Sequence, residues 1–220
     1  MLLLALDTST PAVSAALHDG ARVVAESTVV DARRHSELLA PAIAGVLARA
    51  GVAPGDLTQV AVGVGPGPFT GLRVGVVTAL TLGAALGLPA VGVCSQDALA
   101  HAAVRDGDVD GPFAVVTDAR RREVYWARYD HAGLRVGAPR VDRPDLVAEV
   151  AAADGLAVIG PGTELYRFAG PPPVRPVGPL SAGALAEAVA AGRVELLPPR
   201  PLYLRRPDAT PPGERKKVLG

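Results

Sequence analysis

Cysteine and net charge are both scarce in this chain of 220 residues. The single cysteine, Cys94, can form neither an intrachain disulfide nor a multi-cysteine zinc site, which is typical of a cytosolic protein. The 22 basic and 22 acidic side chains cancel, so no overall electric field attracts nucleic acid or a membrane surface. We therefore expect a cytoplasmic protein whose charged contacts come from local patches.

Metal-ligand pairs and targeting segments are missing as well. The chain begins MLLLALD, without a basic stretch, and Asp7 interrupts the apolar run, so we do not expect a signal peptide. The uncharged stretch from Val74 to Val93 could span a bilayer by its length, but Pro89 breaks it, and a buried helix followed by a strand is the better interpretation. The four histidines are scattered, with no pair at the spacing of helical metal ligands: His18, His35, His101 and His131. We expect no membrane contact and no metal site.

Hydrophobic periodicity predicts a mixed sheet with helices packed on it. Apolar runs bounded by turn residues predict strands over 2–6, 13–17, 22–30, 59–64, 90–94, 113–117, 123–129 and 157–160. Helical periodicity covers 36–50, 69–86, 96–104, 144–152 and 182–191. The order, strands in a row and then alternating helices and strands, favours an α/β fold.

The pattern restarts halfway along the chain. The segments LLLALDTSTPAVSAAL and FAVVTDARRREVYWARY each run from a strand through an aspartate and a tight turn into a second strand, which indicates two related halves. A polar, turn-rich stretch at 106–112 separates them. We predict an N-terminal subdomain over 1–105, a second subdomain over 106–197, and a Pro- and Arg-rich tail over 198–220 that is extended or mobile.

These duplicated units resemble those of the actin, hexokinase and Hsp70 class of ATPases. The resemblance implies a duplicated, ribonuclease-H-like, actin-like (ASKHA) fold with two subdomains of mixed sheets flanked by helices. The candidate nucleotide contacts, vestigial or functional, are Asp7, Thr8, Ser9 and Asp118. The turn after Asp118 has no glycine that would let backbone amides reach a phosphate. A stand-alone ATP- or metal-dependent kinase or hydrolase is the alternative function, and it depends on Asp7 and Thr8.

The stretch GVGPGPFTGLRVGV at 63–76 fits no phosphate-binding motif. It lacks the Gly-Lys-Ser/Thr end of a P-loop, and Pro66 and Pro68 have no backbone N–H to donate. Small residues then recur at every fourth position: Gly71, Gly75, Ala79, Gly83 and Gly87. Glycine costs about 1 kcal/mol per helical position relative to alanine. Such a stripe therefore indicates the close approach of another backbone, either within the chain or from a partner.

Five motifs together resemble the TsaB family, also called YeaZ, over essentially the whole chain. They are LALDTST at 4–10, RRHSELLAPAI at 33–43, GVGPGPFTGLRVGV at 63–76, DARRREVYWARY at 118–129 and PLYLRRPDAT at 201–210. The resemblance implies a cytoplasmic scaffold subunit of the machinery that transfers a threonylcarbamoyl group to N6 of adenosine 37 in ANN-decoding tRNAs. Such a subunit has no catalytic activity alone and stabilises the catalytic subunit TsaD as a heterodimer. ATP and the metal would belong to partner subunits, which include a TsaE-type ATPase.

The catalytic relative carries a His-x-x-x-His metal pair just after a Gly-Val-Asn strand end. The similar position here reads GVCSQDAL at 92–99, which puts Ser95 and Leu99 where the two histidines would be. Neither side chain can replace imidazole at an iron or zinc site. The resemblance therefore implies neither a metal site nor a catalytic residue in this chain, and no nucleophile–base pair supports the peptidase descriptions attached to the wider family.

The resemblance places the partner interface on two helices and the glycine-proline loop. The expected interface residues are His35, Leu38, Leu39, Ala42, Ile43, Val46, Gly65, Pro66, Gly67, Phe69, Thr70, Gly71, Arg73, Gly75, Val76 and Ala79. The same face could pair two copies of the isolated chain, so a homodimer is a competing prediction. The candidate tRNA contacts are Arg120, Arg121, Arg122, Arg205 and Arg206, with Arg33 and Arg34. Zero net charge predicts that tRNA binding is weak or indirect.

Overall fold

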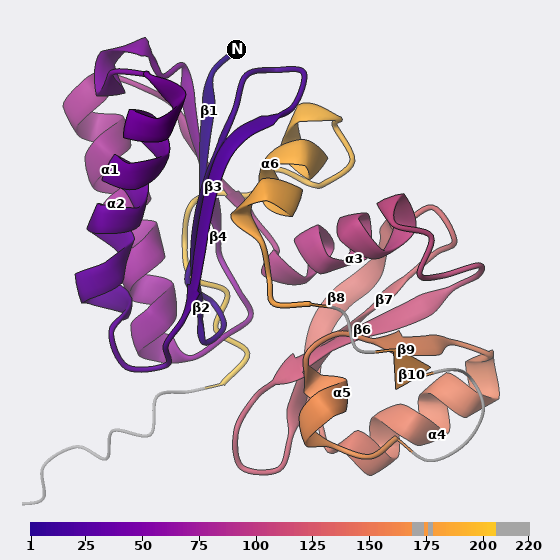
Figure 1. Ribbon diagram of the computed structural model, residues 1–220. Helices are drawn as coiled ribbons and strands as arrows, with labels where there is room; N and C mark the ends of the chain where they lie inside the picture. The colour runs from indigo at the N-terminus through magenta and orange to yellow at the C-terminus, as the bar shows by residue number, and fades with distance from the viewer. Residues whose placement is uncertain (169–173, 176–177, 206–220) are drawn as a thin grey trace, which may run out of the picture.

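A computed structural model describes residues 1–168, 174–175 and 178–205. Its two lobes each contain a five-stranded sheet with helices on both faces (Figure 1). The predicted α/β class and the predicted pair of mixed sheets are confirmed. Part of the predicted tail, residues 206–220 with Arg206, lies outside the described residues.

The first sheet contains the N-terminal strands. They are β1 (Leu3–Asp7), β2 (Ala12–His18), β3 (Val23–Val30), β4 (Gln59–Gly63) and β5 (Ala90–Val93). In space the order is β3-β2-β1-β4-β5; β2 is antiparallel to both β1 and β3, whereas β4 is parallel to both β1 and β5. Leu4 and Leu6 of β1 pack on one face while Leu3 and Ala5 pack on the other, because successive side chains of a strand alternate.

The second sheet repeats this plan. It contains β6 (Phe113–Asp118), β7 (Val124–Tyr129), β8 (Arg135–Asp142), β9 (Ala157–Ile159) and β10 (Val174–Arg175). Its order, β10-β9-β6-β7-β8, has the same strand directions as the first sheet in the same sequence of elements. The predicted duplication is therefore confirmed.

The helices form layers on the sheets (Figure 1). The outer face of the first sheet carries α1 (His35–Ala50) and α2 (Phe69–Leu86), and that of the second carries α4 (Pro144–Asp154) and the short α5 (Gly162–Leu165). Between the sheets, α3 (Ser95–Arg105) and α6 (Ala182–Ala190) pack on each other. A 3₁₀ turn (Pro54–Asp56) leads into β4.

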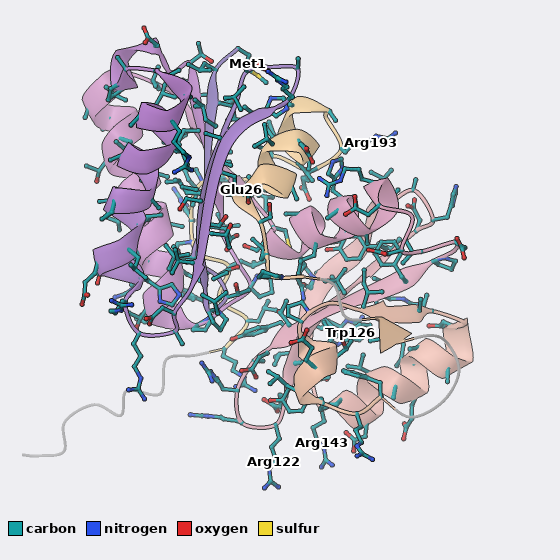
Figure 2. All side chains as sticks on the ribbon, viewed as in Figure 1. Met1, Glu26, Arg122, Trp126, Arg143 and Arg193 are labelled. Carbon is teal, nitrogen blue, oxygen red and sulfur yellow. The ribbon has the colours of Figure 1, made fainter. Side chains whose placement is uncertain are left out.

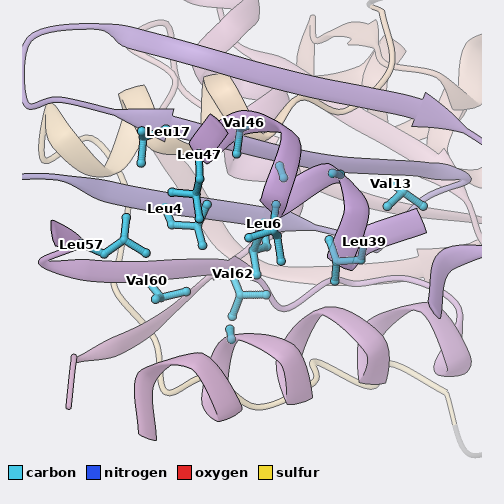
Figure 3. Packing of buried hydrophobic residues seen from close by; sticks show 14 of the residues in the cluster. Leu4, Leu6, Val13, Leu17, Leu39, Val46, Leu47, Leu57, Val60 and Val62 are labelled. Atoms are coloured by element: carbon cyan, nitrogen blue, oxygen red, sulfur yellow. The ribbon is translucent and has the colours of Figure 1, made fainter. Parts of the chain in front are cut away.

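Each face of each sheet buries its own hydrophobic cluster. Leu39 and Val46 of α1 pack on Leu6 and Val62 of the first sheet (Figure 3). On the opposite face of that sheet, Leu185 of α6 packs in a second cluster. The segment predicted as a second subdomain, 106–197, therefore supplies a helix to the first lobe. The sequence shows that α6 has an apolar face, but not which sheet covers it.

Besides the 3₁₀ turn, three elements were absent from the sequence-based prediction: β8, α5 and β10. The strand β8 is an edge strand with a single buried residue, so it lacks the alternation that marks a half-buried strand. The predicted tail also begins as packed chain. In it, Leu202 N donates to Val64 O at 2.7 Å, and Leu197, just before the predicted tail, bridges Gly92 at the edge of the first sheet.

By length and composition α2 is the one helix in the described part of the chain that could cross a membrane. In the folded chain it packs along β4 and buries Leu72, Val76 and Ala79, whereas Val77 and Leu80 are exposed. The prediction of a buried helix is thus right for one side of α2 only.

Two glycines of α2 and one in the loop before it bring this helix against the β1–β2 turn. A Cβ on Gly67 would overlap the carbonyl oxygen of Ser9, and one on Gly71 would overlap that of Thr8. A Cβ on Gly75 would lie 2.5 Å from Thr8 Oγ1. The Thr8 hydroxyl donates to Gly71 O at 2.8 Å and accepts from Gly75 N at 3.0 Å. The sequence predicted that the glycine stripe lets another backbone come close, either within the chain or from a partner. At Gly71 and Gly75 the contact is within the chain.

Replacing Gly71 by alanine should destabilise the fold although alanine is the better helix former. The new Cβ would overlap the Thr8 carbonyl, and overpacking costs about 1–3 kcal/mol. Gly45 of α1 is the matched control, because a Cβ there meets only the flexible Arg49 side chain at 3.4 Å. Gly45→Ala should stabilise by about 0.5–1 kcal/mol. Urea unfolding of both variants measures the change in the free energy of unfolding relative to the wild type. If Gly71→Ala were as stable as the wild type, the close contact would be contradicted.

Candidate functional site

Three segments meet on the buried carboxylate of Asp7 at the end of β1. Its Oδ1 accepts hydrogen bonds from the backbone N and the hydroxyl of Ser9, each at 2.7 Å. Its Oδ2 accepts from the hydroxyl of Ser95, the first residue of α3, at 2.6 Å. Ser95 Oγ in turn accepts from Gly65 N at 3.1 Å. One carboxylate thus joins the β1–β2 turn, the loop before α2 and the start of α3.

This carboxylate faces no open space. Asp7 and Thr8 have no exposed surface, and a Cβ on Gly63 would overlap Asp7 Oδ2. Burial raises the pKa of Asp7 above its usual value, and the hydrogen bonds from Ser95 and Ser9 act in the opposite direction. A phosphate or a hydrated metal ion has no surface of Asp7 to approach in this arrangement.

Ser95 and Leu99 occupy the positions where the resemblance would place metal-binding histidines. Ser95 is hydrogen-bonded to Asp7, and Leu99 is buried between α3 and the second sheet. Within the described ranges, no three His, Cys, Asp or Glu side chains lie together as metal ligands would.

Asp118, the remaining candidate nucleotide contact, lines a cleft of about 450 Å³ between the lobes. Its Oδ1 accepts from Arg120 N at 2.8 Å and from Tyr166 OH at 3.0 Å. Thr117 also lines the cleft, and its buried hydroxyl has no hydrogen-bond partner. Asp7, Thr8 and Ser9 are not among the lining residues. The structure therefore does not bring the candidate nucleotide contacts together in one accessible site.

Apart from Glu37, Arg49 and Arg73 nearer the helix ends, the outward sides of α1 and α2 form an uncharged surface, which we name the α1/α2 face. Its exposed members are Ala40, Pro41, Ala44, Ala48, Val77, Leu80, Thr81 and Ala84. Val77 is 59% exposed and Leu80 is 44% exposed. No charged residue occurs between Ala40 and Ala48 or between Val74 and Leu86. An outer helix surface without charge is typical of a surface that is covered in the working protein.

Most residues expected at the partner interface lie inside the chain instead. The buried ones are Leu39, Ala42, Ile43, Val46, Gly65, Pro66, Gly67, Gly71, Gly75, Val76 and Ala79. Apart from the loop residues, they belong to helices that are apolar nearly all round, and such a pattern does not tell the side on the sheet from the side in solvent. In the sequence, the uncharged run from Val74 to Leu86 was the signal that could have placed Val77, Leu80 and Ala84 on a covered outer surface. The interface itself stays a prediction, and its residues are reassigned to the α1/α2 face.

The other expected interface residues surround the first turns of the two helices. Thr70 is exposed, Leu38 is half-buried, and His35 Nε2 donates to Thr10 O at 2.8 Å. The guanidinium of Arg73 lies 3.8 Å from the ring centre of Phe69 and donates to Tyr203 OH at 3.1 Å. Phe69 and Tyr203 stack with ring centres 4.9 Å apart.

The candidate tRNA contacts Arg120, Arg121 and Arg122 form the tip of the β6–β7 hairpin, and all three are exposed. Arg205 donates to Ala119 O at 2.8 Å and forms an ion pair with Glu123, so it ties the C-terminal segment to this hairpin. Arg206 lies outside the described residues.

Asp7→Asn should change how stability depends on pH. Because burial raises the pKa of Asp7 above 3.8 in the folded chain, the folded state binds this proton more tightly than the unfolded state. Wild-type stability therefore falls as pH rises from about 4 through the folded pKa. Asparagine can still accept from Ser9 but does not titrate. The melting temperature of the variant minus that of the wild type should grow with pH; a constant difference would contradict the burial effect.

Comparison with known proteins identifies the relatives of this chain. The family described as "TsaD: tRNA N6-adenosine threonylcarbamoyltransferase" matches residues 23–171. An uncharacterized protein of Mycobacterium tuberculosis is 47% identical over 212 residues, which cover 95% of this chain and 94% of that protein. The tRNA threonylcarbamoyladenosine biosynthesis protein TsaB of Escherichia coli is 35% identical over 153 residues, 68% of this chain and 65% of that protein.

The comparison with solved structures gives the same family as the comparison of sequences. YeaZ from Pseudomonas aeruginosa superimposes with a TM-score of 0.76 at 32% identity, over 92% of this chain and 99% of that one. The chain belongs to the TsaB/YeaZ family.

Proposed function

We propose that this chain acts in tRNA threonylcarbamoyladenosine biosynthesis as a non-catalytic subunit that binds a TsaD-type catalytic subunit through the α1/α2 face. The TsaB proteins of Escherichia coli and Bacillus subtilis, both named for this biosynthesis, support the pathway. The match to the TsaD family supports a partner of similar fold, because related chains can pair through equivalent helices.

The observation that carries the proposal is the absence of charge on the α1/α2 face. Leu80 and Val77 project from a helix side that has no acidic or basic residue from Val74 to Leu86. The neighbouring side of α1 offers alanines and Pro41, whose small size lets a partner helix lie close. A stable complex buries on the order of 1,600 Å² in total, which two helices facing two others can supply.

A non-catalytic role is supported by the state of the Asp7 cluster. An enzyme of the actin-like class would need Asp7 within reach of its substrate, but the side chain is sealed by Gly63 and held by Ser9 and Ser95. We therefore favour the scaffold over a stand-alone kinase or hydrolase. In this proposal ATP and the metal are bound by partner subunits, a TsaE-type ATPase joins through the complex, and a homodimer through the same face competes in isolation.

Leu80→Arg should abolish the heterodimer and leave the fold intact. Leu80 is exposed in the isolated chain, so the arginine is solvated there, but it would be buried without a counter-charge in the complex. Leu146→Arg on α4 is the matched control, since Leu146 is similarly exposed, at 48%, on the other lobe. Size-exclusion chromatography with light scattering, on each variant alone and mixed with the TsaD-type subunit of the same organism, measures the assembly.

The wild type and Leu146→Arg should form a heterodimer on mixing, whereas Leu80→Arg should elute as separate chains with an unchanged melting temperature. A heterodimer that survives Leu80→Arg would place the interface elsewhere. Substitutions of Leu39 or Gly75 would not test this interface, because Leu39 lies in the core and Gly75 contacts Thr8.

A further inference from the structure

Three consecutive arginines adopt a backbone conformation that disfavours them. Arg120, Arg121 and Arg122 have φ angles of 61°, 55° and 61°, in the left-handed region. Glycine, asparagine and aspartate occupy this region at lower cost than residues with long side chains. The hairpin tip therefore keeps arginine at three positions where the backbone favours other residues, which indicates that the side chains themselves are used.

The turn is held by hydrogen bonds of its backbone, and the Arg120 side chain pairs with Asp118 Oδ2 at 3.5 Å. Asp118 Oδ1 accepts from Arg120 N at 2.8 Å, and Glu123 N donates to Arg120 O at 3.0 Å. Ala119 N donates to Glu123 O at 3.0 Å and closes the hairpin. The Arg120 side chain is 62% exposed, and Figure 2 shows Arg122 pointing away from both lobes. The guanidinium groups are thus presented from a fixed backbone.

Several arginines gather around this tip. Arg33 and Arg120 line one pocket beside the first turns of α1 and α2, and Arg120, Arg121 and Arg205 line another. Among the described residues, Asp118 pairs with Arg120 and Glu123 pairs with Arg205. Arginines of both lobes thus lie together at this edge.

Aromatic rings lie in the same place. The pocket that contains Arg120 and Arg121, about 200 Å³ in volume, is also lined by Phe69, Tyr125 and Tyr203. Tyr203 is 39% exposed and stacks on Phe69. Arginines beside an exposed aromatic face are the combination that binds single-stranded RNA, in which guanidinium groups contact phosphates and rings stack on bases. An acidic protein segment would use the arginines but has no bases for the rings.

We propose that the Arg120–Arg122 turn, with Arg33 and the Phe69–Tyr203 pair, is a contact for a tRNA. The proposal rests on the function proposed above, which supplies the RNA. The turn lies at the edge where α1 and α2 begin (Figure 1), so an RNA held by a partner on the α1/α2 face can reach it. Arginine suits this role because its planar fork makes paired hydrogen bonds to phosphate oxygens.

Because the backbone of the turn is left-handed, the three arginines can be replaced without straining it. The triple variant Arg120→Asn, Arg121→Asn, Arg122→Asn removes three charges and places a residue that tolerates the conformation at each position. Its melting temperature should equal or exceed that of the wild type. Bound to the TsaD-type subunit, it should bind an unmodified tRNA transcript about tenfold more weakly, and the slope of log K against log salt concentration should fall by about 2–3.

The triple lysine variant at the same positions is the control, because it keeps the charge and should retain most of the affinity and of the salt slope. Unchanged affinity and slope in the asparagine variant would overturn the proposal. So would loss of the heterodimer in that variant, because the arginines would then bind protein rather than RNA. If the wild type forms no heterodimer, the proposed function fails. The tRNA titrations, followed by fluorescence anisotropy, are then repeated on the chain alone and test the RNA contact separately.

Discussion

Helix α2 lies so close to the β1–β2 turn that no side chain fits between them. Gly71 and Gly75 leave room for the Thr8 carbonyl and hydroxyl, and Thr8 then donates to one of these glycines and accepts from the other. This contact sets the position of α2 on the first sheet. It also closes the turn over Asp7, whose carboxylate is satisfied by Ser9 and Ser95. The placement of α2 and the burial of Asp7 both depend on this approach.

The two sides of α2 consequently have different surroundings. The glycine side packs against the β1–β2 turn, while the opposite side carries Val77 and Leu80 into solvent. A helix tied this firmly to its own sheet is a rigid platform, and a rigid apolar surface loses little entropy when it is covered. Membership of the TsaB/YeaZ family and the sealed Asp7 cluster fit a subunit that binds and positions, with chemistry performed elsewhere.

Charge is distributed unevenly between two surfaces. The α1/α2 face has none, whereas the hairpin tip at the other lobe concentrates arginines on a left-handed turn. Arg205 pairs with Glu123 and donates to Ala119 O, so the C-terminal segment connects the first lobe to this hairpin. The proposed protein contact and the proposed RNA contact therefore use separate surfaces of one chain.

The sequence by itself determined the α/β class, the duplication and most element positions, since period-two and helical patterns record local burial. It also indicated the close approach of α2, because small residues at every fourth position on a helix face leave room for another backbone. Only the tertiary structure decided which side of α1 and α2 faces outward, that α6 covers the first sheet, and that Asp7 is sealed. Those outcomes depend on which distant segments meet. A helix that is apolar nearly all round, such as 69–86, carries no local signal to tell a core side chain such as Val76 from an exposed one such as Val77.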